Sequence, residues 1–505
     1  MMTVKQQSFS KTLSALLTSV VSVPVEYDVD VNNLQLDSRQ VKQGDVFIAI
    51  QGEVVNGMDY IDSAIKAGAV AILWEAKTNA IPFAWSKNNE QAKRIPLIAI
   101  NDLKLKLGGL ASLFYGNPSA MLDIVAVTGT NGKTSCVNFI AQSLGKEKKC
   151  GLIGTLGIGI YPGIVAGLYT TPDVVTMHKT LADFVDSHAD YAAVEVSSHA
   201  LAQGRVDEVR FDVAVFTNLT QDHLDYHGTM DDYLKEKIKL FQMPNLKTAI
   251  VNVNDRYGLD IIKSTVAKNI ITYGIDAAIN SPDIYATDIQ CVNGYTEFVL
   301  NTKQGFVPIV SSLVGDFNIS NLLAISAYLQ LHGYSLDRIA ENISTIESVA
   351  GRMQKINVTG FPLVIIDYAH TPDALKQVLD TLSKQFKDNL TCVFGCGGER
   401  DKDKRSKMGE VASTYADTIV LTNDNPRGES AEDIIKHINQ GIGDKAKVII
   451  ELDRKKALEL AIKATSPHGC VLVAGKGHED YQIIGNTRFE FNDVKVVEEI
   501  LSEKQ

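Results

Sequence analysis

Short apolar runs separated by stretches of helix length recur through most of the chain. In the middle of the chain, these runs occupy residues 124–127, 191–196, 211–216 and 248–253. A second series follows Gly351 and Arg352, at residues 363–367, 390–394, 418–422, 448–450 and 471–474. Apolar runs that alternate with helical stretches are typical of mostly parallel sheets with crossover helices. The pattern therefore predicts two doubly wound α/β sheets.

The flanking regions follow other patterns. Residues 34–101 contain β-branched runs at 45–50 and 69–73, which predict a small α/β module. Residues 269–314 alternate polar and apolar positions, most clearly at 295–300, and predict an antiparallel insert or flank. Near the N-terminus, Leu13, Leu16, Leu17 and Val20 have helical spacing, so we interpret residues 12–25 as a short amphipathic helix rather than a signal peptide.

Composition narrows the class of protein. A chain of 505 residues is too long for one hydrophobic core, and we expect three domains. The net charge of −11 argues against general attraction to nucleic acid or anionic membranes. The six scattered cysteines show no zinc-type pairing and predict reduced, buried thiols. With no apolar run of about 18 residues, we predict a cytoplasmic protein without a membrane span.

A glycine-rich loop follows the apolar run at 124–127 and precedes a segment compatible with a helix, residues 134–145. Its sequence is Gly129-Thr130-Asn131-Gly132-Lys133-Thr134. Glycines let backbone N–H groups converge on phosphate oxygens, lysine supplies positive charge, and the hydroxyl of Thr134 suits Mg²⁺. Val127 stands where the standard loop has its first glycine, so this is a variant of the phosphate loop. The loop predicts nucleotide binding.

Polar residues also follow the next two predicted strands. Glu195-Val196-Ser197-Ser198-His199 ends one run, and residues 218–227 follow the other with two aspartates and two histidines in one short segment. Because ligand sites of α/β sheets form at the carboxyl ends of the strands, these groups favour a metal–phosphate site beside the loop. Glu195 is a candidate Mg²⁺ ligand. Taken singly, each of these residues would more often be a solvated loop residue.

Together with the phosphate loop, three further strings resemble the Mur ligase family: Glu195 to His199, Asp222-His223-Leu224-Asp225-Tyr226-His227 and Asp367-Tyr368-Ala369-His370-Thr371-Pro372. The resemblance extends over residues 36–494. It implies three α/β domains: residues 1–105 for the UDP end of the substrate, 106–348 for ATP, with a central P-loop doubly wound sheet, and 349–505 for the incoming amino acid, with a Rossmann-like sheet.

The resemblance also implies an activity. Family members transfer the γ-phosphate of ATP to a carboxylate, and an amine then attacks the resulting acyl phosphate. Asp424-Asn425-Pro426-Arg427 and Ala474-Gly475-Lys476-Gly477-His478-Glu479 resemble members that join meso-2,6-diaminopimelate to the D-glutamyl γ-carboxylate of UDP-N-acetylmuramoyl-L-alanyl-D-glutamate. That reaction builds peptidoglycan precursors. We therefore expect ATP and Mg²⁺ as cofactors, these two small molecules as substrates, and a monomer.

Specific residues carry over by motif position. The resemblance implies catalytic roles for Lys133, His223, Asp367, His370 and Lys237, the last as N6-carboxylysine, since a carbamate could position a metal that a bare ammonium would repel. It implies metal contacts from Thr134, Glu195 and His223. Nucleotide contacts would come from residues 129–134, Asn318, Asn321, Arg352 and His370. Without the resemblance, Lys237 would be assigned to a solvated helix face, and Asn318 and Arg352 to capping and surface charge.

The substrate contacts carry over in the same way. For the UDP substrate the positions are Ser38, Thr170, Thr171, Ser197, Gln203 and Arg205. For the amino acid they are Arg400, Asp424, Asn425, Arg427, Gly475 and Glu479. Arg427 offers the planar, bidentate cation that a distal carboxylate requires, and Glu479 suits an ammonium group. Glu399 stands where the pattern leads us to expect aspartate, a mild departure.

Two classes of alternative remain open. One is another amide ligase on the same scaffold, such as an enzyme adding L-lysine or a folylpolyglutamate synthetase. The other is a P-loop regulatory ATPase that changes shape for a protein partner. A panel of amino-acid acceptors separates the ligases from one another, and basal hydrolysis without any acceptor would favour the regulatory ATPase.

Overall fold

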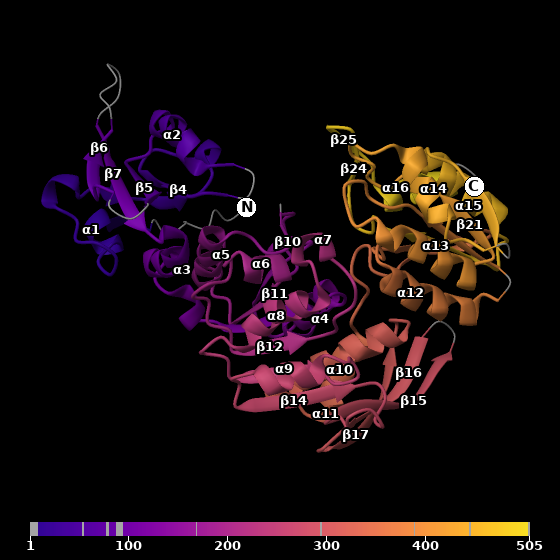
Figure 1. The fold of residues 1–505 in the computed structure, drawn as a ribbon. Helices are drawn as coiled ribbons and strands as arrows, with labels where there is room; N and C mark the ends of the chain where they lie inside the picture. The colour runs from indigo at the N-terminus through magenta and orange to yellow at the C-terminus, as the bar shows by residue number, and fades with distance from the viewer. Residues whose placement is uncertain are drawn as a thin grey trace. The chain divides into compact units, whose positions relative to one another are not determined.

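The computed structural model describes residues 9–52, 55–76, 80–86, 94–167, 169–292, 295–387, 389–443 and 446–502. Contacts divide the chain into two compact units. The first comprises Met1–Ala126, Leu144–Ala214 and Met243–Lys247, and the second comprises Val127–Ser143, Val215–Gln242 and Thr248–Gln505. Figure 1 traces their helices and strands. The two ends of the chain, and so the outer limits of the predicted domains, lie outside the described residues.

A five-stranded sheet lies in the N-terminal part, in the order β3-β4-β5-β7-β6. The strand β4 shows why the sequence forms a sheet here: Val46 and Ile48 pack into one hydrophobic cluster, whereas Phe47 and Ala49 pack into another. Alternate side chains of a strand point to opposite faces, so both faces of this sheet are covered. The elements are α1 (Leu13–Leu16), β3 (Asn33–Gln35), β4 (Asp45–Ala49), α2 (Ile61–Ala67), β5 (Ala71–Ala76), β6 (Phe83–Trp85), β7 (Pro96–Asn101) and α3 (Leu103–Phe114). The helix predicted within residues 12–25 is confirmed only at its start, as α1, with Leu13, Leu16 and Leu17 buried; residues 17–20 form a turn.

The largest sheet has ten strands in the order β10-β9-β11-β8-β12-β13-β14-β15-β16-β17. Its strands are β8 (Asp123–Thr128), β9 (Cys150–Gly154), β10 (Gly157–Ile160), β11 (Tyr191–Glu195), β12 (Val213–Phe216), β13 (Thr248–Asn252), β14 (Asn269–Gly274), β15 (Ile284–Val292), β16 (Tyr295–Thr302) and β17 (Gly305–Ser311). β13 and β14 pair in parallel, as do β9 and β11. β15, β16 and β17 pair antiparallel at one flank, which confirms the prediction from residues 295–300.

Eight helices accompany these strands in the described part of the chain. They are α4 (Lys133–Leu144), α5 (Val174–Asp186), α6 (Ser198–Ala202), α7 (Leu224–His227), α8 (Met230–Phe241), α9 (Gly258–Ser264), α10 (Asp316–Leu331) and α11 (Leu336–Ser344). α10 is buried around nearly its whole circumference, from Asn318 to Leu329. A helix buried on all sides belongs to the interior of a large domain.

The C-terminal part contains a six-stranded sheet in the order β18-β19-β23-β20-β21-β22. Its strands are β18 (Gln354–Ile356), β19 (Leu363–Asp367), β20 (Leu390–Phe394), β21 (Thr418–Leu421), β22 (Lys447–Ile450) and β23 (Cys470–Ala474). Five of these strands pair in parallel, and β18 is antiparallel to β19. The helices are α12 (Pro372–Gln385), α13 (Asp403–Tyr415), α14 (Ala431–Asn439), α15 (Arg454–Ala464) and α16 (Asp493–Ser502). The second doubly wound sheet is therefore confirmed.

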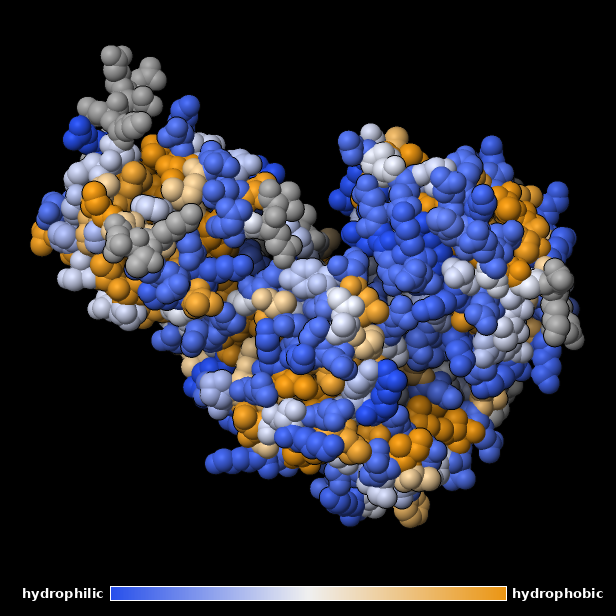
Figure 2. Space-filling view, viewed as in Figure 1, coloured by the Kyte–Doolittle hydropathy of each residue, from blue (hydrophilic) through white to orange (hydrophobic). Residues whose placement is uncertain are grey.

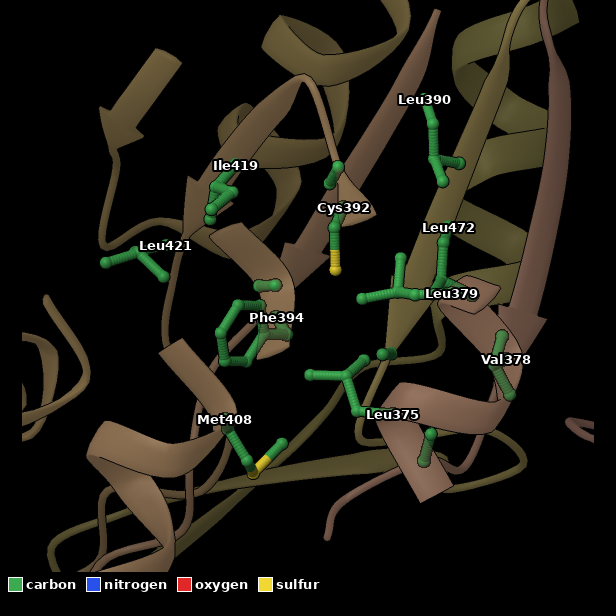
Figure 3. Close-up of a cluster of buried hydrophobic side chains, with 14 of the residues drawn as sticks. Leu375, Val378, Leu379, Leu390, Cys392, Phe394, Met408, Ile419, Leu421 and Leu472 are labelled. Atoms are coloured by element: carbon green, nitrogen blue, oxygen red, sulfur yellow. The ribbon is translucent and has the colours of Figure 1, made fainter. Parts of the chain in front are cut away.

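The strands of this sheet alternate between two cores. Cys392 and Phe394 of β20 face a cluster with Leu375 and Leu379 of α12 and Met408 of α13 (Figure 3). Val393, between them, belongs to the opposite cluster, with side chains of α15 and α16. Helices on both faces explain the continuous apolar runs of the sequence, because each strand is buried on both sides.

Smaller elements complete the fold: β1 (Lys11–Thr12) with β2 (Asp30–Val31), β24 (Tyr481–Ile484) with β25 (Thr487–Glu490), and the 3-10 helices η1 (Val25–Tyr27), η2 (Ser38–Gln40), η3 (Gly57–Tyr60) and η4 (Pro118–Ala120). All six cysteines are free, but the prediction of buried thiols is wrong for Cys291, which is exposed on β15. In the described residues, no helix is long and apolar enough to cross a membrane. On the face shown in Figure 2, hydrophilic residues predominate and hydrophobic ones form separate patches.

Candidate active site

The glycine loop joins the end of β8 to the start of α4, as the sequence predicts. Gly129 has φ +154° and Gly132 has φ +87°, and a Cβ at Gly132 would lie 2.6 Å from Asn321 Oδ1. Only glycine allows both this backbone and this close approach. Lys133 Nζ donates to the carbonyls of Gly129 (3.0 Å) and Thr130 (2.9 Å), so the lysine lies against its own loop.

Residues that follow β12 hold the loop in place. Asn131 N donates to Asn218 Oδ1 at 2.9 Å, and Thr217 Oγ1 donates to the Asn131 carbonyl at 2.6 Å. These bonds fix the peptide in the middle of the loop, next to the first turn of α4. Backbone N–H groups at a helix N-terminus are a ready site for phosphate.

Lys237, on α8, is buried with 1% of its surface exposed. Its Nζ donates to the Gly129 carbonyl at 2.8 Å and lies 4.5 Å from the centroid of the Tyr233 ring. Burial, and then the nearby charge of Lys133, hold the pKa of Lys237 well below its usual range. The alternative of a solvated helix face is therefore wrong for Lys237, although it describes Lys235, which is exposed and paired with Asp232.

Asp222 lies between two histidines. Its Oδ2 is 3.3 Å from His223 Nε2 and 3.8 Å from His370 Nε2. Burial opposes ionisation, but the hydrogen bond with His370 and the charges of both histidines hold the pKa of Asp222 well below its usual range. Asp222 belongs to a motif of the sequence, but no role was predicted for it. The sequence does not show its contact with His370, because His370 is distant in the chain.

A cavity of about 440 Å³ lies within the second unit, and its lining includes Asn131, Gly132, Asn318, Asn321 and Arg352. Asn318, Asn321 and Arg352 thus lie at the same cavity as the loop, whereas the lining of this cavity does not include His370. Arg352 Nη2 donates to Thr134 Oγ1 at 3.2 Å, and its guanidinium lies 4.5 Å from the centroid of the Tyr368 ring. Asn318 lies inside α10 and its Nδ2 donates to the Val314 carbonyl at 2.9 Å, which is not a cap, since the N-cap of this helix is Gly315.

Asp367 and His370 follow β19. Asp367 lines the cavity and accepts hydrogen bonds from Met353 N and Ala369 N, both at 2.8 Å. Burial raises the pKa of Asp367, against the charge of Arg352. His370 Nδ1 lies 2.9 Å from the Tyr368 carbonyl, which leaves Nε2 to face Asp222.

Most of the predicted contacts for the UDP substrate lie in the first unit and form one network around Glu195. Glu195 is fully buried at the end of β11, and its two oxygens accept from Thr155 N (2.9 Å) and Thr155 Oγ1 (3.1 Å). Thr155 Oγ1 is also 3.0 Å from Thr170 Oγ1. Thr155 was missed, although it directly follows β9 at the strand edge where Glu195 was sought.

Thr171 extends the network. Its Oγ1 donates to the Glu195 carbonyl at 2.7 Å and accepts from Ser197 N at 3.2 Å, while Arg205 Nη1 donates to the Thr171 carbonyl at 2.9 Å. Arg205 Nε donates to Gln203 Oε1 at 2.8 Å. Ser38 is buried at the start of η2 in the N-terminal sheet region.

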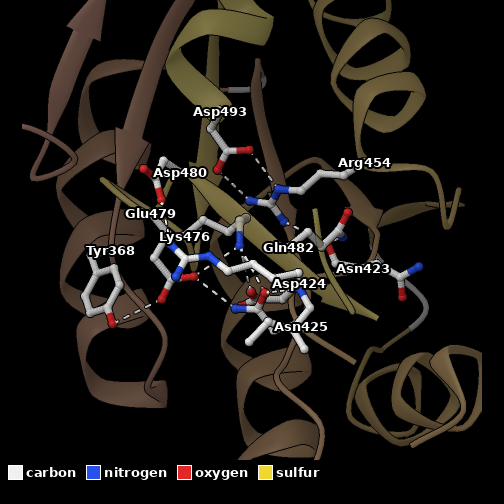
Figure 4. Close-up of polar contacts among 12 residues, drawn as sticks. Tyr368, Asn423, Asp424, Asn425, Arg454, Lys476, Glu479, Asp480, Gln482 and Asp493 are labelled. Atoms are coloured by element: carbon white, nitrogen blue, oxygen red, sulfur yellow. Dashed lines mark hydrogen bonds and ion pairs between the residues drawn. The ribbon is translucent and has the colours of Figure 1, made fainter. Parts of the chain in front are cut away.

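Three of the predicted amino-acid contacts, Asp424, Asn425 and Glu479, lie close together (Figure 4). Asn425 Nδ2 donates to Glu479 Oε2 at 2.9 Å, and a Cβ at Gly475, where φ is +109°, would lie 3.2 Å from Asp424 Oδ2. Arg427 has φ +52°, and its Nη1 donates to the Gly398 carbonyl at 2.9 Å. Arg400 is exposed. Lys476, in the middle of this group, was missed because a lysine between two glycines reads as a solvated turn.

In the part of the chain that the structure describes, no three His, Cys, Asp or Glu side chains form a metal-binding cluster. The predicted metal contacts combine a hydroxyl, Thr134, a carboxylate, Glu195, and an imidazole, His223. The first two are oxygen donors of the kind that Mg²⁺ prefers. Mg²⁺ takes few protein ligands beside water and substrate phosphates, so these types of donor suit it, and the Mg²⁺ contacts stay predictions.

The fold and the site define a class: a P-loop α/β protein with a nucleotide cavity, a buried lysine against its phosphate loop and a second polar pocket on a separate parallel sheet. Three family models match the chain: Mur ligase family, catalytic domain, at residues 30–115; Mur ligase middle domain at 127–329; and Mur ligase, glutamate ligase domain, at 351–477. The chain belongs to the Mur ligase family, whose members are ATP-dependent, amide-bond-forming ligases.

Curated relatives carry a more specific name. UDP-N-acetylmuramoyl-L-alanyl-D-glutamate--2,6-diaminopimelate ligase of Xylella fastidiosa (strain 9a5c) is 41% identical over 488 residues, which cover 95% of this chain and 96% of the relative. The protein of that name from Coxiella burnetii is 41% identical over 478 residues, covering 94% and 96%.

Solved structures agree on the fold. A structure of a ligase with the same name is 32% identical, has a TM-score of 0.69 and covers 98% of this chain and 99% of that one. MurF ligase from Thermotoga maritima in complex with ADP is 19% identical, with a TM-score of 0.66 and coverage of 94% and 98%. The three-domain α/β architecture is therefore confirmed, whereas the domain boundaries at 105 and 348 stay predictions.

Proposed function

We propose that this protein is the ligase that joins meso-2,6-diaminopimelate to the D-glutamyl γ-carboxylate of UDP-N-acetylmuramoyl-L-alanyl-D-glutamate, with ATP converted to ADP and phosphate. The observation that carries the proposal is 41% identity over 95% of the chain to a ligase with this name. The two polar regions support it: one suits a nucleotide phosphate, and the other offers both carboxylates and arginines to an amino acid.

The reaction proceeds in two steps. The γ-carboxylate oxygen attacks the γ-phosphorus of ATP, which forms an acyl phosphate and releases ADP. The amine of diaminopimelate then attacks the acyl carbon, loses a proton, and expels phosphate from the tetrahedral intermediate. The chain contributes by positioning two polyanions and by neutralising charge, since phosphoryl transfer needs little covalent help from the protein.

On the phosphate side, the backbone N–H groups of the loop and Lys133 Nζ would hold the β- and γ-phosphates, for which Lys133 leaves its present loop carbonyls. Asn318, Asn321, Arg352 and His370 would contact the nucleotide. We propose Thr134, Glu195 and His223 as the residues that hold Mg²⁺. When bound, Mg²⁺ supplies positive charge at the phosphates and lowers the cost of bringing the carboxylate to them.

Lys237 is proposed to react with CO₂. Its depressed pKa leaves an unprotonated amine, and this nitrogen attacks CO₂, forms an N–C bond and releases one proton, which yields an anionic carbamate. Nζ lies 2.8 Å from the carbonyl of Gly129, so the new carboxylate would stand at the phosphate loop. There the carbamate adds a negative charge that can orient a cation.

For the amino acid, we propose that Arg427 and Arg400 bind carboxylates, while Asp424, Asn425, Gly475 and Glu479 line the rest of the pocket. Ser38, Thr170, Thr171, Ser197, Gln203 and Arg205 would contact the UDP substrate. The proposal extends to a cytoplasmic monomer, because ATP and the nucleotide precursor are cytoplasmic and the substrates are small molecules.

A panel of acceptors tests the proposal. Phosphate release from ATP is measured with the UDP-muramoyl dipeptide and, in turn, diaminopimelate, L-lysine, D-alanyl-D-alanine and no acceptor; a separate reaction supplies folate with glutamate. We expect release that depends on both the dipeptide and diaminopimelate. Turnover with L-lysine instead, or with folate and glutamate, would transfer the assignment to those ligases, and release without an acceptor would favour a regulatory ATPase.

A further inference from the structure

Lys476 is a fully buried lysine between β23 and β24, in the middle of the proposed amino-acid pocket. A buried ammonium is costly unless carboxylates and hydrogen-bond acceptors surround it. Asp424, Asn425 and Glu479 compensate the charge of Lys476, so the lysine also holds these side chains in place. The proposed function assigns the same three residues to the binding of the amino acid.

Three side chains face the ammonium (Figure 4). Lys476 Nζ donates to Glu479 Oε2 at 3.1 Å and to Asn425 Oδ1 at 3.3 Å, and it lies 3.6 Å from Asp424 Oδ1. Asn425 Nδ2 donates to the same oxygen of Glu479 at 2.9 Å. Lysine, glutamate and asparagine thus form a closed triangle of hydrogen bonds.

The triangle determines which way the Asn425 amide points. Its Oδ1 accepts from both Lys476 Nζ and Ile483 N, the latter at 2.9 Å, so Nδ2 must face Glu479. The lysine thus adds a third group that distinguishes the two ends of the amide, beside the backbone N–H of Ile483 and the carboxylate of Glu479, which only accepts. Lys476 therefore orients Asn425 and, through it, the carboxylate of Glu479.

The charges around Lys476 do not cancel. Asp424 and Glu479 carry two negative charges against its one positive charge. The neighbouring cation, Arg454, is already paired with Asp493 at 2.8 Å, with both side chains fully buried. Asp424 Oδ1 is buried and accepts no hydrogen bond from the described residues. The group formed by Lys476, Asp424 and Glu479 thus keeps one net negative charge, which matches one ammonium group of an amino acid.

We infer that Lys476 is a positioning residue for the amino-acid substrate: it holds Asn425 and Glu479 in their binding orientation and compensates one of the two negative charges of Asp424 and Glu479. This inference rests on the proposed function. It concerns only the amino-acid side of the reaction, because the contacts of Lys476 described above all lie in the C-terminal sheet region.

The test compares Lys476→Met with Arg488→Met in the full-length protein. Both cations lie over the Tyr481 ring, at 5.4 and 4.0 Å, but Arg488 is on the surface and pairs with Asp480. For Lys476→Met we expect the KM for diaminopimelate to rise roughly 10- to 100-fold, with the KM for ATP changed less than about twofold. Arg488→Met should leave both constants unchanged.

A double-mutant cycle with Glu479→Gln shows whether Lys476 acts through Glu479. If it does, Lys476→Met combined with Glu479→Gln raises the KM for diaminopimelate much less than the product of the two single effects. Independent, multiplicative effects would contradict the inference. So would an unchanged KM for diaminopimelate in Lys476→Met, or an equal rise in both KM values.

Lys476→Arg provides a second variant in case Lys476→Met does not fold. It keeps the charge, but a planar guanidinium cannot reproduce the contacts of a compact ammonium, so we expect a folded protein whose KM for diaminopimelate alone is raised. A normal KM in this variant would contradict the inference. If the unmodified protein fails to use diaminopimelate at all, the proposed function itself is wrong.

Discussion

The phosphate loop and the amino-acid pocket each lie against a fully buried lysine, but the surroundings of the two lysines differ. Burial, and then the nearby charge of Lys133, lower the pKa of Lys237, whose Nζ faces a backbone carbonyl of the loop. Lys476 faces Asp424 and Glu479 and forms part of an ion network. Burial alone therefore does not determine the role of a lysine, because the charges of the neighbouring groups differ between these two sites.

The largest expected effect is on the phosphate side. Lys133→Ala should lower kcat by roughly 10²- to 10³-fold with every amino acid, because it removes a cation that stabilises charge in the transition state. Initial rates of ADP formation measure this. Lys407→Ala, an exposed lysine of α13 that bonds Gln221, is the control and should retain normal rates. Full activity of Lys133→Ala would remove the loop from the mechanism.

Lys237→Met should lower kcat by roughly 10²-fold, and Lys237→Arg should not restore it, since a guanidinium cannot take up CO₂ as an amine does. Nuclear magnetic resonance after addition of ¹³C-bicarbonate should show a carbamate carbon in the unmodified protein that is absent from Lys237→Met. Lys235→Met, on the same helix but exposed, should keep both the signal and the rate. A normal rate in Lys237→Met would contradict the carbamate proposal.

On the amino-acid side, Arg427→Ala should raise the KM for diaminopimelate roughly 10- to 100-fold, because a charge-assisted bond to its distal carboxylate is lost. The KM for ATP should stay nearly unchanged. Steady-state kinetics with each substrate varied in turn distinguishes the two constants. An equal change in both would show that the two regions do not bind separate substrates.

The smallest effect concerns stability in acid. Burial, and then the charge of Arg352, lower the pKa of His478 from 6.5 to about 4. The unfolded chain binds this proton at higher pH than the folded one, so stability is lost as pH falls from about 6.5 towards 4, by up to roughly 3 kcal/mol. Urea unfolding of His478→Gln at pH 7 and pH 4.5 should show a smaller loss than in the unmodified protein. An identical loss would contradict the assignment.

The sheets could be predicted from the sequence because buried parallel strands require continuous apolar runs, and β8, β11, β19 and β23 begin and end within a residue or two of those runs. The phosphate loop could be predicted because residues 129–134 are adjacent in the chain. The catalytic role proposed for Lys237 could be predicted only from the resemblance to the Mur ligase family. Its helix also carries the exposed Lys235, and the sequence alone does not show which of the two lysines is buried.

Contacts between distant segments could not be predicted. Asp222 follows β12 of one sheet and meets His370, which follows β19 of another sheet. Lys476 follows β23 and meets Asn425, which follows β21, although β20 separates these two strands. The burial of Lys476 depends on the same packing, which no local pattern encodes. Residue type and spacing thus identify groups that can react, while tertiary packing determines which charges they meet.

The central claim is that the phosphate region activates a carboxylate that the amine then attacks. The most direct measurement uses UDP-muramoyl dipeptide labelled with ¹⁸O in the D-glutamyl γ-carboxylate, with ATP and diaminopimelate, and analyses the released phosphate by mass spectrometry. Passage through an acyl phosphate predicts one ¹⁸O atom in the inorganic phosphate for each amide bond formed. Unlabelled phosphate, or ¹⁸O found in AMP, would contradict it.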